Sequence, residues 1–130
     1  MPDTAPPTVL IVEPSETTRK ILEFSFVAEG FVPVSVASMQ EALFSLRTFV
    51  PNIAVVEVQL PDATGLAVVR TLRDNPVFRS IPVLMIAGSA EERGALDQAE
   101  EFYEAVFDKP FSLKKMVQLA KGLMAAAAGP

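Results

Sequence analysis

The segment Asn52-Ile-Ala-Val-Val-Glu-Val58 decides the fold, because it is a short apolar run with a single acid near its end. Such a run is typical of a central strand in a parallel sheet, which helices cover on both faces. Glu57 is flanked there by residues of core character. A carboxylate in this setting needs a partner or a function, since burying an unpaired charge is costly. Glu57 is therefore the first candidate functional residue.

Four further runs of strand character lie on either side of this segment and alternate with stretches of helical length and period. With residues 52–58 as the third strand, the others are predicted at residues 8–13, 32–37, 82–87 and 103–108.

Helix start signals stand between these strands. Ser15 predicts the N-cap of a helix that runs to Glu29, with Gly30 at its C-terminal end. The second helix opens with the capping box Ser38-Met-Gln-Glu41. A third helix is predicted over residues 64–74. Ser89 opens a fourth helix that Gly94 weakens and that carries the acids Glu91, Glu92, Asp97, Glu100 and Glu101. Ser112 opens the last helix.

Strands that alternate with helices predict right-handed crossovers and a parallel sheet. Five such units predict an α/β, flavodoxin-like (βα)5 three-layer sandwich with strand order 2-1-3-4-5. We expect one domain over residues 8–124, a disordered N-terminus at residues 1–7, and an Ala-rich tail or linker at residues 125–130. In this fold the binding crevice lies beyond the carboxyl ends of the strands, between the first and the third.

Composition excludes several classes of function. The 130 residues contain no cysteine and no histidine, which removes thiolate and imidazole nucleophiles, bases and metal ligands. A net charge of -5 with scattered basic residues argues against a nucleic-acid surface. The sequence has no apolar run long enough to span a membrane and no secretory signal at its N-terminus. We expect a cytoplasmic protein.

Charged residues follow three of the predicted strands. The first ends at Glu13-Pro14, the third reaches Glu57, and the fifth is followed by Lys109. The fourth strand ends at the uncharged Ala87. Two carboxylates and one ammonium therefore converge on the crevice. The alternative is an ordinary salt-bridge cluster at the end of the sheet.

These residues carry a resemblance to a known family. The acid at position 13, the segment Glu57-Val-Gln-Leu-Pro61, Gly65 and the turn Lys109-Pro110-Phe111 stand in the order and at the spacing of a receiver domain of two-component response regulators. Across residues 8–124 the chain resembles that family. The resemblance implies a phosphoryl group accepted by an aspartate at the end of the third strand, with Mg²⁺ held by that aspartate and an acidic pair. It also implies a lysine on the phosphoryl oxygens and a relay through a hydroxyl residue and an aromatic.

The chain departs from that pattern at four positions. Glu57 replaces the acceptor aspartate, Pro14 the second acid, Ala87 the hydroxyl residue and Val106 the switch aromatic, whereas Lys109 is kept. Glutamate places its carboxylate roughly 1 to 1.5 Å further out than aspartate, and errors of that size are costly for positioned chemistry. We therefore expect a degenerate receiver, or pseudo-receiver, that is not an enzyme and has no catalytic residue. No cofactor is expected and Mg²⁺ binding is doubtful, with Glu13 and Glu57 as the weak metal candidates.

The retained lysine suggests a constitutive role for Glu57. Our hypothesis is a standing Glu57–Lys109 ion pair that partly imitates the phosphorylated state. In the alternative, Glu57 merely fills the pocket and the domain is an inert scaffold.

Function in such a domain depends on its surfaces, through a protein partner or a homodimer. The resemblance implies docking on the face of helix 4, strand 5 and helix 5, where Lys114 and Lys115 stand near an acidic fourth helix. In the first helix, the resemblance implies that Ile21, Leu22, Ser25 and Phe26 face the sheet. Phe24 and Val27 then fall on another face, where polar residues are usual, which indicates a second contact surface. The alternatives are a solvated charged face and a slightly rotated or covered helix.

Two other functions remain open at this stage. One is an active receiver that accepts a phosphoryl group with Mg²⁺ in a two-component phosphorelay. The other is a flavin or nucleotide-phosphate binder, suggested by the hydroxyl-rich Ser15-Glu-Thr-Thr18, although this loop has no glycine to close on a phosphate. The interaction module is the preferred prediction.

Overall fold

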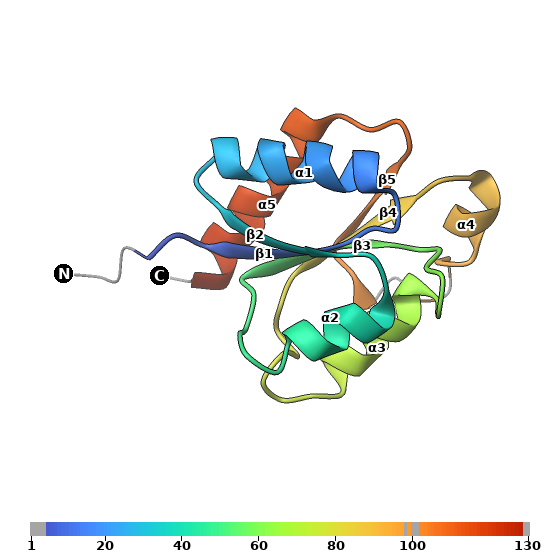
Figure 1. Cartoon of the computed structure of the whole chain (residues 1–130), viewed down its shortest axis with the longest axis horizontal. Coiled ribbons are helices and arrows are strands. Elements are labelled where there is room, and N and C mark those ends of the chain that lie inside the picture. The colour runs from blue at the N-terminus through green and yellow to red at the C-terminus, as the bar shows by residue number, and fades with distance from the viewer. Residues whose placement is uncertain (1–4, 98, 100–101, 129–130) are drawn as a thin grey trace.

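The computed structural model describes residues 5–97, 99 and 102–128 and contains one sheet of five parallel strands (Figure 1). The strand order is β2-β1-β3-β4-β5, which confirms the predicted topology. The strands are β1 (Thr8–Val12), β2 (Val32–Val36), β3 (Ile53–Glu57), β4 (Val83–Ala87) and β5 (Ala105–Asp108).

Helices cover both faces of this sheet and complete the three layers (Figure 1). One face carries α1 and α5, and the other carries α2 and α3. The helices are α1 (Glu16–Ala28), α2 (Met39–Ser45), α3 (Gly65–Arg73), α4 (Ala90–Gly94) and α5 (Leu113–Ala128).

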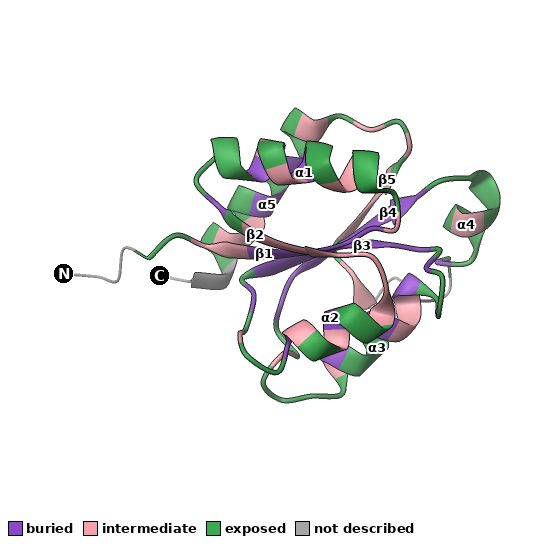
Figure 2. Cartoon of the chain, in the orientation of Figure 1, coloured by how far each residue is buried: buried purple, intermediate pink, exposed green. Residues whose placement is uncertain are grey.

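The central strands carry the core. Alternate side chains of β3 enter the two apolar clusters, so Val56 packs toward α2 and α3 while Val55 packs toward α1 and α5. Every residue of β3 and of β4 is buried (Figure 2). Burial on both faces explains why these strands read as continuous apolar runs.

The predicted helix starts are confirmed by side-chain caps. The hydroxyls of Ser15, Ser38 and Ser89 each accept a hydrogen bond from the backbone N–H three residues later. Gly30 has φ of +89°, which a residue with a side chain rarely adopts, and it follows the end of α1 as predicted.

The fourth helix is much shorter than predicted. It ends at Gly94, and the chain then turns so that Leu96 is buried in the core cluster on the α2 and α3 face. Glycine lowers helix stability by about 1 kcal/mol relative to alanine, and burial of Leu96 offsets the loss of further helix. Asp97 therefore follows the helix instead of lying on it, and the predicted acidic positions 100 and 101 are not among the described residues.

The chain ends extend the predicted domain slightly. The carbonyl of Pro7 accepts a hydrogen bond from Val32 N–H at 2.8 Å, so the pairing of the first strand with β2 begins one residue before Thr8. At the other end, α5 continues to Ala128, into the predicted Ala-rich tail. The disorder predicted for residues 1–4 concerns a part that the structure does not describe.

Candidate functional site

The carboxyl ends of β1 and β3 and the turn after β5 bring Glu13, Glu57 and Lys109 together. Lys109 Nζ lies 2.9 Å from Glu13 Oε1 and 2.9 Å from Glu57 Oε1, so one ammonium bridges two carboxylates. Glu13 is 1% exposed and Glu57 is 5% exposed. The bridge is therefore a largely buried ion cluster, in which each acid depends on the same lysine.

The remaining carboxylate oxygens are also paired. Glu13 Oε2 accepts a hydrogen bond from Ser15 N–H at 2.9 Å, and Glu57 Oε2 accepts one from Val58 N–H at 2.6 Å. Glu13 Oε1 is buried without a hydrogen bond of ordinary geometry, so its contact with Lys109 is an ion pair. The charges of the two buried acids are therefore offset mainly by one shared lysine.

Burial and charge act on the titration of this cluster. Burial raises the pKa of the Glu57 carboxyl, Lys109 opposes that rise, and the nearby charges of Glu13 and Glu92 reinforce it. Burial alone would lower the pKa of Lys109, but its contacts with Glu13 and Glu57 outweigh burial and raise it. Lys109 is therefore held in its charged form.

The loop after β3 fixes the position of Glu57. Gly65 N–H donates to Val58 O at 2.7 Å, and a Cβ on Gly65 would collide with the carbonyl oxygen of Glu57. Glycine is thus required at position 65 for the start of α3 to approach the end of β3.

The other predicted pocket residues surround the cluster but add no polar side chain. Ala87 is fully buried at the end of β4, and its carbonyl accepts from Lys109 N–H at 2.9 Å. Pro14 follows Glu13 directly, where it offers no carboxylate. Val106 is half-buried against the core cluster of the α2 and α3 face. The peptide bond between Lys109 and Pro110 is cis.

Glu92 and Arg93 are functional-site neighbours that sequence reasoning missed. Glu92 Oε1 accepts from Gly88 N–H at 2.9 Å, and Arg93 Nη1 lies 2.9 Å from Asp108 Oδ2. The spacing Ser89-x-x-Glu92 is a capping-box pattern and could have indicated that Glu92 reaches back to the strand end. No comparable local signal exists for Arg93, whose partner is 15 residues away.

Comparison with known families identifies the fold and its class. The family model described as "Response regulator receiver domain" matches residues 9–121. The chain belongs to this family. It is a receiver domain of a response regulator, a type of signalling module that works by contacting other proteins.

Similar proteins cover nearly the whole receiver domain. The polar-differentiation response regulator DivK of Brucella anthropi is 28% identical over 122 residues, covering 94% of this chain and 99% of its own. The Brucella ovis DivK is 29% identical over 119 residues, covering 92% and 97%. A crystal structure of a putative response regulator from Chloroflexus aurantiacus has a TM-score of 0.84 and 26% identity, covering 92% of this chain and 98% of that one.

The resemblance to receivers implies a Mg²⁺ site at the strand ends, but the residues that stand there in this chain do not fit such a site. Glu13 and Glu57 direct one oxygen each to Lys109 and the other to a backbone N–H. Mg²⁺ requires near-octahedral oxygen ligands, and Pro14 supplies none. Over residues 5–97, 99 and 102–128, no three acidic side chains are grouped where they could hold a metal ion. Nor does any helix among the described residues have the length and apolar character to cross a membrane.

The two predicted partner surfaces lie on neighbouring helices, α1 and α5. Phe24 is 77% and Val27 is 55% exposed on α1, as the sequence predicts. Ile21 was expected to face the sheet, but this is wrong: it is exposed, because the fully buried Leu22 and Phe26 fill the inward face of α1.

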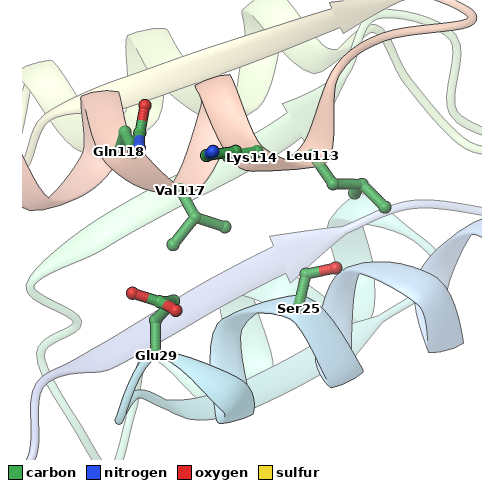
Figure 3. A pocket seen from close by; sticks show the side chains of 6 residues that line it. All are labelled: Ser25, Glu29, Leu113, Lys114, Val117 and Gln118. Carbon is green, nitrogen blue, oxygen red and sulfur yellow. The ribbon is translucent and has the colours of Figure 1, made fainter.

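Lys114 and Lys115 are exposed near the start of α5. Lys114 lines a cavity of about 270 Å³ between α1 and α5 (Figure 3). In this cavity Val117 points from α5 toward α1, while Ser25 and Glu29 point from α1 toward α5.

Proposed function

We propose that this receiver domain is a phosphorylation-independent signalling module, a pseudo-receiver that acts through protein–protein interaction and not as an enzyme. The observation that carries the proposal is the bridge from Lys109 to both Glu13 and Glu57 at 2.9 Å. The cation that would contact a phosphoryl group is already neutralised by two buried acids.

Electrostatics support the loss of phosphoryl transfer. A phosphoryl group adds roughly -1.5 to -2 charges, which would enter a pocket that already holds two carboxylates and one lysine. In catalysis of this type, metal ions and positioned donors offset that charge. Pro14 removes one metal ligand, and Ala87 removes the hydroxyl donor. We therefore propose that the pocket takes neither Mg²⁺ nor a phosphoryl group.

The Glu57–Lys109 contact supports an on-like conformation over an inert scaffold. It stands where the family's lysine contacts the phosphoryl group, and it exists without any modification of the chain. We propose that the domain presents its partner surface constitutively, on the face that includes β5 and the Lys114 and Lys115 end of α5.

Intact-mass measurement tests this proposal. After incubation with acetyl phosphate and Mg²⁺, we expect the mass of the domain to be unchanged. A transient or stable gain of about 80 Da that maps to Glu57 would overturn the proposal. The matched control is the triple variant Pro14→Asp, Glu57→Asp and Ala87→Thr, which restores the family's residues at these positions. We expect this variant to gain the adduct under the same conditions.

A further inference from the structure

A groove on the outer side of α1 is not explained by the pocket. It runs between α1 and β2, has a volume of about 470 Å³, and is lined by Lys20, Glu23, Phe24, Val27 and Pro33. Phe24 is the most exposed of the large apolar side chains in the part of the chain that the structure describes, at 77%. An exposed phenylalanine beside an apolar groove is typical of a contact surface.

The strand below this groove is an edge of the sheet, and its chemistry limits how a partner can dock. Val32 N–H donates to Pro7, and Val36 O accepts from Glu13 N–H, so the even-numbered residues of β2 bond toward β1. The backbone of Pro33 therefore faces outward, where proline has no N–H to donate. The missing donor disfavours the addition of a strand, so we expect a partner to dock here through side chains.

We propose that the occupant is a second copy of this chain, in a symmetric dimer in which the Phe24 of each copy enters the α1–β2 groove of the other. A two-fold contact requires one patch that is complementary to itself. Here the protruding ring and the groove that receives it are adjacent on the same surface, and Phe24 belongs to both.

The charges that line the groove favour the same arrangement. Lys20 and Glu23 have opposite signs and stand three residues apart on α1. Within one copy, Lys20 pairs with the exposed Glu16 at 3.0 Å and Glu23 accepts a hydrogen bond from Ser35 Oγ at 2.7 Å, contacts that the dimer would share or exchange. A two-fold axis across α1 makes the two helices antiparallel, which reverses the order of these residues. Lys20 of one copy is then directed toward Glu23 of the other, whereas parallel helices would oppose like charges.

This dimer is expected to be weak. Stable interfaces bury about 800 Å² per partner, and this contact involves only one helix surface and one edge strand. We expect dissociation constants in about the micromolar range or above. The inference rests on the proposed function as a protein-contact module, but it does not depend on the state of the Glu57 pocket.

Sedimentation velocity of the full chain, from about 10 µM to about 1 mM, tests the dimer. We expect reversible association of the unmodified protein. Phe24→Glu should weaken it by about thirtyfold or more, as for a residue at the centre of an interface. The matched control is Phe44→Glu on α2, because Phe44 is 69% exposed and does not line this groove. Circular dichroism checks that both variants are folded.

A charge exchange tests the antiparallel arrangement. Lys20→Glu and Glu23→Lys should each weaken association, because each opposes like charges twice across the axis. The double variant Lys20→Glu with Glu23→Lys should recover most of the affinity, since the opposite charges face each other again.

Three results would overturn the dimer. The first is a monomer at every concentration, which would leave the groove to a different protein. The second is equal weakening of association by Phe24→Glu and Phe44→Glu. The third is no recovery of affinity in the double charge variant. Each of these results leaves the intact-mass experiment on the pocket unaffected, so failure of the dimer and failure of the pseudo-receiver proposal are distinguishable.

Discussion

Two regions of this receiver contain a lysine that joins distant parts of the chain, and they differ mainly in burial. At the strand ends, Lys109 lies 2.9 Å from the buried Glu13 and Glu57. Between α5 and α1, Lys121 lies 3.0 Å from Glu29, and both side chains are about half exposed. The distances are nearly equal, but removing a buried partner leaves an uncompensated charge, while an exposed partner is replaced by water. Contact distance alone therefore does not measure the importance of a charge.

The largest expected effect comes from removing the shared lysine. Lys109→Met leaves two buried carboxylates without their cation, and we expect a loss of about 3 to 5 kcal/mol in the free energy of unfolding. Lys121→Met is the matched control and should cost no more than about 1 kcal/mol. Urea denaturation measures both. Equal losses in the two variants would contradict the distinction between the regions.

The next effect compares two glycines. Gly65→Ala places a methyl group against the Glu57 carbonyl oxygen, and we expect a loss of about 1 to 3 kcal/mol. A Cβ at Gly122 in α5 meets no atom within 4 Å, so Gly122→Ala should stabilise the protein by about 0.5 to 1 kcal/mol. Thermal unfolding of the two variants gives the comparison. A Gly65→Ala protein as stable as the parent would show that α3 does not hold the end of β3.

The titration of Glu57 provides a smaller effect. Because burial raises its pKa in the folded protein, the folded state retains the proton to higher pH than the unfolded state, whose pKa is close to 4.5. Stability from this group is present below that unfolded value and is lost as pH rises through the folded value. Glu57→Gln should remove this loss. The measurement is the difference between the unfolding free energies of the variant and the parent across acidic pH. A difference that does not change with pH would contradict the direction of the shift.

The smallest effect is expected for the exposed pair of Arg93 and Asp108. Both side chains are about half exposed, so Arg93→Gln should change the free energy of unfolding by no more than about 1 kcal/mol. The same urea experiment measures it. A larger loss would indicate that the α4 segment depends on this pair to stay against β5.

The fold was largely predictable, because its determinants are local. The continuous apolar strands, the serine caps and Gly30 each act within a few residues, and alternating elements restrict the topology. The length of α4 was not predictable in the same way, since burial of Leu96 after Gly94 is a tertiary effect. The outward position of Ile21 likewise depends on how α1 rotates when Leu22 and Phe26 fill the core.

The candidate site was predictable in place but not in connectivity. Parallel strands end at the same edge of the sheet, so Glu13, Glu57 and Lys109 had to converge. The sequence suggested a contact from Lys109 to Glu57, whereas the structure has Lys109 bridging both acids. Side-chain reach and the Ser15 and Val58 donors decide that arrangement, and neither follows from spacing along the chain.

Amide NMR spectroscopy tests most directly the central claim that Lys109 and the two acids engage one another and leave no site for a metal or a phosphoryl group. The N–H groups of Ser15, Val58 and Gly88 donate to Glu13, Glu57 and Glu92, so their resonances report on all three acids. On addition of Mg²⁺ with beryllofluoride, a mimic of the phosphoryl group, we predict that these resonances do not move. Saturable movement of the three resonances would show that the pocket still binds metal and phosphoryl mimic, and would contradict the claim.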